Sequence, residues 1–191
     1  MVRNDERRRA LADAGIAVLA DAGARGLTHR AVDRHAKVPV GTTSNYFRSR
    51  DDLLQALIAR IGERLAPDPE VLARLSRRKP GKALYADYLR DIVRRLSREH
   101  DVTLALFELR LETARNPEVE EVIGGWLRAG FAGDVAFNAE AGLPGGAREI
   151  ALFHYAIDGL LLDRLTTSID VTTSTDAVID ALVEGLLPGQ G

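Results

Sequence analysis

The sequence predicts an all-α protein of about nine helices, in which a small N-terminal head of three helices precedes a larger helical bundle. Two observations support this fold class. Apolar residues recur at steps of three and four along most of the chain, which is the spacing of one face of an α-helix. Proline and glycine interrupt that pattern where one helix would end and the next begin, and no segment shows the alternation of a strand.

The composition fits a globular chain with one sizeable core, or a small module joined to a larger one, since 46% of its 191 residues are apolar. The lack of cysteine excludes disulfides and thiolate metal sites and is compatible with a reducing cytoplasm, where we expect the protein to act. An apolar run follows the basic residues 7–9, as in a signal peptide, but Asp13 and Asp21 interrupt it. No other stretch approaches the roughly 20 apolar residues that cross a bilayer.

Charge is divided unevenly along the chain. Residues 1–50 contain ten Lys or Arg and five Asp or Glu, a net of +5, whereas residues 51–191 contain sixteen and twenty-three, a net of −7. Contact with a polyanion needs local rather than overall positive charge, so this split is typical of a nucleic-acid-binding head on a body with another task. For any single arginine the alternative is simple solvation of a helix start.

The head begins with a helix whose apolar stripe includes Leu11 and Val18 and which Gly23 and Gly26 end. A second helix is predicted to begin at the N-cap Thr28, with a hydrophobic staple between Leu27 and Val32. Helical spacing divides this second helix into an inner and a solvent face: Ala31, Val32, His35 and Ala36 inside, and Arg30, Asp33, Arg34 and Lys37 outside.

A third short helix is predicted from Pro39 to Tyr46, because proline disfavours helix at Val38 and suits the first turn of a new helix. This segment is poor in apolar residues and rich in small hydroxyl and amide side chains, which let a backbone approach a phosphate or a base edge. Tyr46 and Phe47 are alternatively the aromatic plug of the head's core, the favoured interpretation for Phe47. A helix pair of this size typically holds one helix in a groove of a nucleic acid.

Behind the head, six further segments have helical spacing. Ser49 and Asp101 are the predicted N-caps of two of them, and Pro67, Pro117 and the loop 143–146 mark interruptions. The first is long enough to act as a semi-rigid lever between head and body. These segments are 49–65, 84–96, 101–111, 117–142, 147–166 and 175–187, and residues 70–76 lie between the first two.

Segment 147–166 is apolar around nearly its whole circumference and therefore needs cover on more than one side, and segment 175–187 has apolar residues at regular steps of three and four. We expect them to form a four-helix contact with a second copy of the chain across a two-fold axis. A purely intramolecular core is the alternative. The predicted interface residues are Leu152, Leu161, Leu165, Val178, Ile179, Leu182, Val183 and Leu186.

Residues 7–54 resemble the helix-turn-helix of the tetracycline-repressor (TetR) family of bacterial regulators. The resemblance lies in the helix capped by Thr28, the turn 36–41, the triplet 45–47, and Arg50 and Leu53. It implies a DNA-binding domain at 1–48 and a ligand-binding and dimerisation domain at 49–191. It also implies a homodimeric repressor, without a cofactor, whose two heads enter successive major grooves of a palindromic operator until a small-molecule effector releases them.

Four residues depart from the family pattern. Lys37 stands where the family usually has glycine, and Pro39 replaces the usual serine cap of the recognition helix. Thr43 replaces an aliphatic residue and Ser44 a frequent tyrosine. If the turn needs a positive φ at Lys37, that residue carries a modest strain.

The resemblance assigns DNA contacts to the turn and the third helix. Thr42, Thr43 and Asn45 are the candidates for base edges, and Asn45 can pair with adenine. Basic and hydroxyl side chains nearby are candidates for phosphate, and residues 7–9 for an arm on the DNA. The complete predicted set is Thr28, Arg30, Lys37, Val40, Thr42, Thr43, Ser44, Asn45, Tyr46, Arg48 and Arg50.

An effector pocket is expected in the body, and each apolar candidate has plain core packing as its alternative. His154 and Asp158 share a helix face, beside Glu108 if the helices pack that way. They are open to interpretation as a polar anchor, a satisfied buried pair or, least favoured, a metal site. The candidates are Tyr85, Tyr88, Leu89, Phe107, Glu108, Leu111, Trp126, Phe131, Phe153, His154 and Asp158.

Two other function classes are weaker. An enzyme is disfavoured because the sequence has only four histidines and no Glu-x-x-His motif, phosphate-cradling glycine loop or nucleophile elbow. A helical ligand-binding or interaction protein that binds no specific DNA is the second alternative. DNA affinity that falls steeply with salt would separate the regulator from both.

Overall fold

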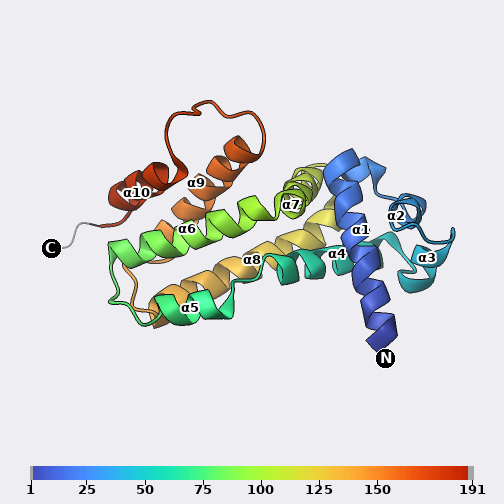
Figure 1. Ribbon diagram of the computed structural model, residues 1–191, viewed down its shortest axis with the longest axis horizontal. Helices are drawn as coiled ribbons and strands as arrows, with labels where there is room; N and C mark the ends of the chain where they lie inside the picture. Colours follow the sequence, from blue (N-terminus) through green and yellow to red (C-terminus); the bar gives the residue numbers. More distant parts are fainter. Residues whose placement is uncertain (1, 189–191) are drawn as a thin grey trace. The chain divides into compact units, whose positions relative to one another are not determined.

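The computed structural model describes residues 2–188, with side chains from Asn4, and within that range the chain forms ten α-helices and no strand (Figure 1). The predicted all-α class is confirmed, with one helix more than the nine expected. The helices are α1 (Val2–Gly26), α2 (His29–His35), α3 (Thr42–Tyr46), α4 (Arg50–Arg64), α5 (Pro69–Leu75), α6 (Lys82–Arg98), α7 (His100–Thr113), α8 (Pro117–Glu140), α9 (Ala147–Leu165) and α10 (Thr175–Leu186).

The helices form two compact units that are not continuous in sequence. Unit 1 contains the chain up to Ala66 together with Glu99–Leu127, and unit 2 contains Pro67–Arg98 together with the chain from Arg128 onward. Helix α8 therefore contributes its first part to unit 1 and its second part to unit 2. In residues 2–188, none of the helices combines the length and the apolar character needed to span a membrane.

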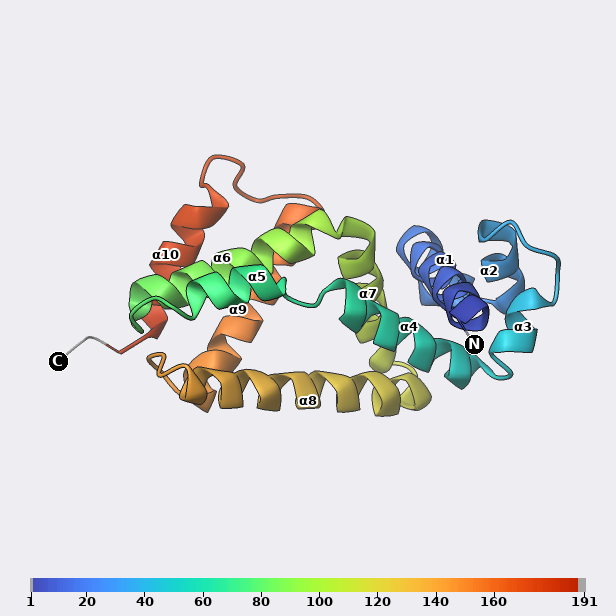
Figure 2. The same cartoon turned by 60° about the horizontal axis from the view of Figure 1, so that its bottom comes forward.

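Unit 1 is organised around α1, which packs against α2, α4 and α7, while α3 packs against α2 (Figures 1 and 2). Phe47 is fully buried, which confirms its predicted role as the aromatic plug. Burial of such side chains is the main driving force that holds short helices together. The largest fully buried side chains of this unit are Leu11, Ile16, Leu19, Leu27, Phe47, Leu53, Leu57, Ile61, Leu109 and Ile123.

Local capping signals are confirmed at two helix starts in unit 1. The Thr28 hydroxyl accepts a hydrogen bond from the Ala31 amide at the start of α2. The Ser49 side chain accepts from the Asp52 amide, and the Asp52 carboxylate accepts from the Ser49 amide, which makes a reciprocal capping box at α4.

Two predicted helix starts are wrong. Helix α3 begins at Thr42 rather than Pro39, because Gly41 has a left-handed φ of 93° and residues 39–41 form a turn closed by the Thr42 amide on the Pro39 carbonyl. Helix α7 begins one residue before Asp101, with Glu99 at the N-cap and no side-chain capping bond.

Charged side chains connect three helices of unit 1. The Arg60 guanidinium of α4 donates to both carboxylate oxygens of Asp13 on α1, at 2.9 and 3.0 Å. Arg64 donates to the same carboxylate and, at 2.5 and 2.9 Å, to Glu99 at the start of α7. Paired guanidinium–carboxylate contacts fix orientation as well as distance, so α1, α4 and the start of α7 are held in one arrangement.

Unit 2 is built on α6, which packs against α5, α9 and α10. Its core includes Leu84, Leu89, Phe153, Leu161 and Ile179, all buried. The Arg90 guanidinium of α6 forms ion pairs with Asp176 and Asp180 of α10, and Lys82 pairs with Glu184. Apolar packing and these surface ion pairs together hold α10 against α6.

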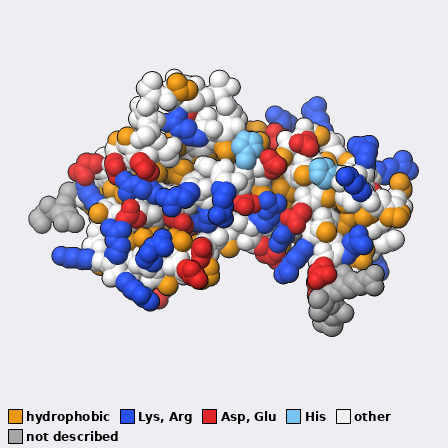
Figure 3. Space-filling model, viewed as in Figure 1, with side chains coloured by type: hydrophobic (Ala, Val, Ile, Leu, Met, Phe, Trp, Pro, Cys, Tyr) orange, Lys and Arg blue, Asp and Glu red, His pale blue; other side chains and the backbone are white. Residues whose placement is uncertain are grey.

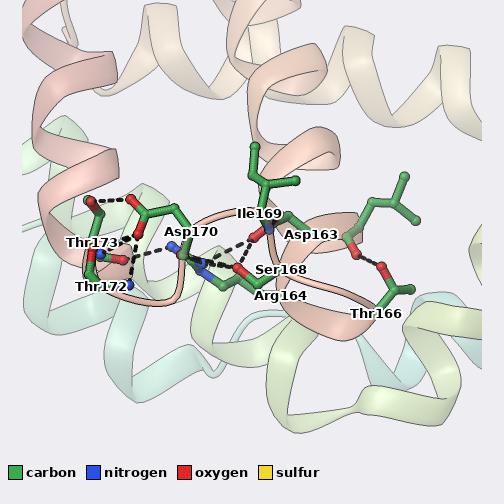
Figure 4. A network of polar contacts seen from close by, with 9 residues as sticks. Asp163, Arg164, Thr166, Ser168, Ile169, Asp170, Thr172 and Thr173 are labelled. Carbon is green, nitrogen blue, oxygen red and sulfur yellow. Dashed lines mark hydrogen bonds and ion pairs between the residues drawn. The ribbon is translucent and has the colours of Figure 1, made fainter.

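The loop between α9 and α10 is held by the Arg164 guanidinium (Figure 4). One guanidinium nitrogen donates to the Ser168 hydroxyl and to the Asp170 carbonyl, both at 2.7 Å, and the other donates to the Thr173 carbonyl at 2.8 Å. Asp163 accepts from the Ile169 amide at 2.8 Å. The loop is therefore internally bonded although it lies at the surface.

Candidate functional site

The N-terminal end of α3 is fixed by a carboxylate on the preceding helix. Asp33 Oδ1 accepts from the Thr43 amide at 2.7 Å and from the Thr43 hydroxyl at 2.5 Å, and Asp33 Oδ2 accepts from the Gly41 amide at 2.7 Å. Asp33 is 1% exposed and Thr43 is 0% exposed. A buried carboxylate with three donors is fully satisfied, so α2 and α3 are joined by directional bonds as well as by apolar contact.

Hydrogen bonding keeps Asp33 ionised. Burial raises the pKa of its carboxyl, but the bonds from the Thr43 hydroxyl and from the Thr43 and Gly41 amides lower it, as does the nearby His29. The net effect is a pKa below the ordinary value. The negative charge also lies at the N-terminal end of α3, where the helix dipole favours it.

The C-terminal end of α3 is held by two basic side chains. The His29 ring donates through Nε2 to the Phe47 carbonyl at 2.8 Å, since a carbonyl can only accept. The Arg8 guanidinium donates to the Tyr46 carbonyl at 2.7 Å and lies 4.7 Å from the centroid of the Phe47 ring. Positive groups at this end also match the helix dipole.

The turn between α2 and α3 contains the one non-glycine residue with positive φ among the described residues, Lys37 at φ 53°. The predicted strain at this position is confirmed, because a side chain in the left-handed region costs energy that glycine avoids. The strained turn presents Val40, which is 79% exposed, next to Gly41.

Five predicted DNA contacts are exposed and have no side-chain bond to the described part of the chain. Asn45 is exposed on α3 and Val40 on the turn, and three exposed basic side chains lie on α2, on the turn and directly after α3. Figure 3 shows Lys and Arg side chains around the part of unit 1 that carries α2 and α3. The five residues are Arg30, Lys37, Val40, Asn45 and Arg48.

Two residues of the predicted set are held by hydrogen bonds within the chain. Thr43 is fully buried against Asp33, so it is not available to a base edge. The Arg50 guanidinium donates to the carbonyls of Leu27 and Ala24, at 2.8 and 3.1 Å, and so joins the start of α4 to the end of α1, although the residue is exposed.

The remaining hydroxyl side chains of the set are partly engaged. Thr28 caps α2, the Thr42 hydroxyl donates to the Pro39 carbonyl at 2.6 Å, and the Ser44 hydroxyl donates to the Gly41 carbonyl at 2.9 Å. Each oxygen keeps a free lone pair for a further donor. Tyr46 is half-buried and lines a surface cavity of about 330 Å³ together with Arg8, Arg48, Asp52, Gln55 and Ala56.

Two residues of α2 were assigned to the wrong face. Asp33 was expected towards water and is buried, because its partners are amides of the following turn and helix. His35 was expected inside and is exposed, because α2 ends at this residue.

The predicted effector residues are divided between the two units. In unit 1, Glu108 lies against Gly23 of α1, Trp126 faces Gly62 of α4, Phe107 is half-buried and Leu111 is 59% exposed. In unit 2 lie Tyr85, Tyr88, Leu89, Phe131, Phe153, His154 and Asp158.

Aromatic rings gather in unit 2. The rings of Tyr85 and Phe153 have centroids 4.8 Å apart, and those of Tyr88 and Phe137 are 5.3 Å apart. Phe131 meets the His154 ring edge-on at 5.7 Å. Rings in such pairs attract one another beyond simple burial.

His154 pairs with a carboxylate that the sequence did not suggest. Its Nε2 lies 3.0 Å from Asp134 Oδ2 of α8, and both side chains are substantially exposed. Burial and the charges of Asp134 and Glu149 raise the pKa of Tyr85 to about 12, so negative potential reaches this aromatic cluster. Within the described residues no group of three or more His, Asp or Glu side chains is placed to hold a metal ion.

The predicted dimer residues differ in their availability. Leu161, Ile179 and Val183 are at most 4% exposed within the single chain, so they belong to the core of unit 2 rather than to a free surface. The other five, Leu152, Leu165, Val178, Leu182 and Leu186, are half-buried. Tyr155 and Leu162 of α9, which the sequence analysis did not select, are 70% and 50% exposed.

Two family profiles match the chain. One, described as bacterial regulatory proteins of the tetR family, matches residues 11–57, and the other, described as tetracyclin repressor-like, C-terminal domain, matches residues 80–189. The second match alone covers more than half of the chain. The chain belongs to the TetR family. It is therefore a ligand-responsive, DNA-binding transcriptional regulator.

Solved structures share the whole fold of this TetR-family chain. The multidrug binding protein EbrR complexed with imidazole is 27% identical, with a TM-score of 0.69 and coverage of 97% of each chain. A TetR-family member from Streptomyces coelicolor A3 is 26% identical, with a TM-score of 0.72 and coverage of 96% of this chain and 99% of that one. EbrR complexed with ethidium is 26% identical, with a TM-score of 0.68 and the same coverage. No curated protein matches the chain.

Three residues that position the TetR-type helix-turn-helix were not predicted in that role: Asp33, His29 and Arg8, of which Arg8 was expected as part of an arm on the DNA. All three are charged or polar and bond mainly to backbone groups, which residue spacing alone does not identify. The one available signal was Thr43, a polar residue on the inner face of a short helix, which needs a polar partner.

Acid should weaken the helix-turn-helix through Asp33. Because its folded-state pKa is depressed, Asp33 contributes fully above the ordinary pKa of about 3.9 and loses this contribution as the pH falls through the lowered value. We therefore expect the gap in free energy of unfolding between the wild type and Asp33→Asn to be largest near about pH 6 and to narrow below about pH 4. Urea titrations at several pH values measure this gap, and a gap independent of pH would contradict the assignment.

Proposed function

We propose that this regulator is a homodimeric cytoplasmic repressor that reads a palindromic operator through α3 and its preceding turn, and that an aromatic cation releases it. The proposal divides the chain into a DNA-binding part at 1–48 and a ligand-binding and dimerisation part at 49–191. The observation that carries it is the outer face of α3 and the turn, where the exposed Asn45 and Val40 stand among basic side chains.

Base reading is assigned to Asn45 and Val40. The Asn45 amide has no side-chain bond to the described residues and can pair with N6 and N7 of adenine in the major groove. Val40 offers an apolar contact of the kind that a thymine methyl accepts. Arg30, Lys37 and Arg48 are assigned to phosphates, because their cationic groups are exposed on α2, on the turn and directly after α3.

Dimerisation is assigned to the exposed face of α9. Tyr155, Gly159 and Leu162 follow one another at steps of four and three, so they share a helix face, and space around Gly159 is open. An apolar face without cover in its own unit suits the isologous contact of a two-fold dimer. The half-buried Leu152, Leu165, Val178, Leu182 and Leu186 are assigned to its margins.

The effector is assigned to the aromatic cluster of unit 2. Phe131 and His154 supply ring surfaces, and Asp134 supplies negative charge beside them. A flat organic cation is attracted both by ring faces and by a carboxylate. EbrR, which shares the fold, has been solved with ethidium, malachite green and proflavin.

Selection of bound duplexes from a random pool tests the DNA-binding proposal, and we expect a palindromic operator.

Asn45→Ala should relax preference at one base position in each half-site by about 1–3 kcal/mol. Arg48→Ala should weaken binding to all sequences alike and reduce the salt slope by about one. Arg74→Ala, the same change on α5 of unit 2, is the control. Absence of any preferred duplex, or equal loss on every sequence for Asn45→Ala, would contradict the assignment.

Fluorescence titration with ethidium tests the effector class. We expect saturable binding that releases the operator, and Asp134→Asn should weaken this binding about three- to tenfold because it removes the charge beside the rings. Glu140→Gln, which changes an exposed charge on the same helix, should leave the affinity unchanged. An equal effect of both variants would remove Asp134 from the site.

A further inference from the structure

We propose that Asp33 is a positioning residue for sequence-specific DNA binding, which sets the orientation of α3 through Thr43 without touching DNA itself. The inference rests on the proposed DNA-reading role of α3. It concerns the pair Asp33–Thr43 at the buried face of that helix, away from the exposed residues assigned to bases and phosphates.

Helix α3 cannot hold its own N-terminal end. It has five residues, well short of the length at which a helix is stable alone. Its N-cap is Gly41, and no side chain within α3 or the N-cap bonds its first amides. The first amides of any helix need acceptors from elsewhere, so the position of α3 depends on the group that supplies them.

Asp33 supplies these acceptors in a geometry that fixes orientation. One carboxylate oxygen binds the amide before the helix, at Gly41, and the other binds the amide and hydroxyl of Thr43 inside it. Two separate attachment points restrict rotation as well as translation. Because both side chains are enclosed, water cannot replace a lost bond, and an apolar pair would offer contact without direction.

The orientation of Thr43 determines where Asn45 points. Two residues along a helix correspond to a rotation of about 200°, so a Thr43 side chain directed at α2 sends Asn45 to the opposite side. The burial of Thr43 and the exposure of Asn45 agree with this relation. A turn of α3 about its axis would therefore move Asn45 with respect to a base edge.

The other end of α3 stays attached when the Asp33 bonds are weakened. His29 holds the Phe47 carbonyl and Arg8 holds the Tyr46 carbonyl, and neither bond involves Asp33. Loss of the Asp33–Thr43 bond therefore loosens the N-terminal end of α3, next to Val40 and close to Asn45, without releasing the helix. This predicts a loss of base discrimination larger than the loss of phosphate binding.

The test compares Thr43→Val, which removes only the hydroxyl donor and keeps the shape, with Thr43→Ser, which keeps the donor. Asp33→Asn is a second variant, in which an amide NH₂ opposes a backbone donor. Fluorescence anisotropy measures the affinity of the full-length chain for the operator selected by the wild type and for an unrelated duplex. The temperature is one at which circular dichroism shows Thr43→Val and Thr43→Ser to be fully folded, so Thr43→Val decides the test even if Asp33→Asn does not fold.

Thr43→Val should lower operator affinity about tenfold while its affinity for the unrelated duplex and its salt slope stay at the wild-type values. Thr43→Ser should remain within about twofold of the wild type, and Asp33→Asn should follow Thr43→Val. A purely stabilising pair would leave the ratio of the two affinities unchanged in folded protein, and that result would overturn the inference. A wild type without any preferred duplex would overturn the proposed function and this inference together.

Discussion

Because α3 is only five residues long, its first amides need an acceptor from elsewhere, and the buried Asp33 carboxylate supplies it. The rest of the proposed DNA-binding surface depends on this attachment. It directs Thr43 inward and Asn45 outward, and it closes the turn that exposes Val40. The ionised carboxylate is tolerated in the interior because every bond it accepts comes from a fixed donor.

The surrounding helices of unit 1 give that attachment a stable frame. Helix α1 reaches α3 through Arg8 and reaches α4 through the Asp13 carboxylate, while Arg64 extends the same ionic group to Glu99 at the start of α7. Helix α3 is thus bonded to an arrangement of longer helices that pack an apolar core. A ligand alters such a regulator only if it favours one arrangement of these helices over another.

Sequence reasoning succeeded where the signal was local. The caps at Thr28 and Ser49 and the buried Phe47 follow from neighbouring residues and from side-chain size, and all three are confirmed. It failed for Asp33, because a charged side chain was assumed to seek water when its partners were mainly backbone groups brought close by folding. Among the dimer candidates, Leu161 and Ile179 show that an apolar helix face does not reveal whether its cover comes from the same chain or from a partner.

The amide hydrogen exchange of Thr43 and Gly41 tests the central role of Asp33 most directly. Amides at the start of a short surface helix ordinarily exchange quickly, because no helical carbonyl protects them. If Asp33 holds them as described, both should exchange about as slowly as the Val32 amide in the core of α2, and they should lose this protection in Asp33→Asn. Exchange in the wild type as fast as in an exposed turn would contradict the account.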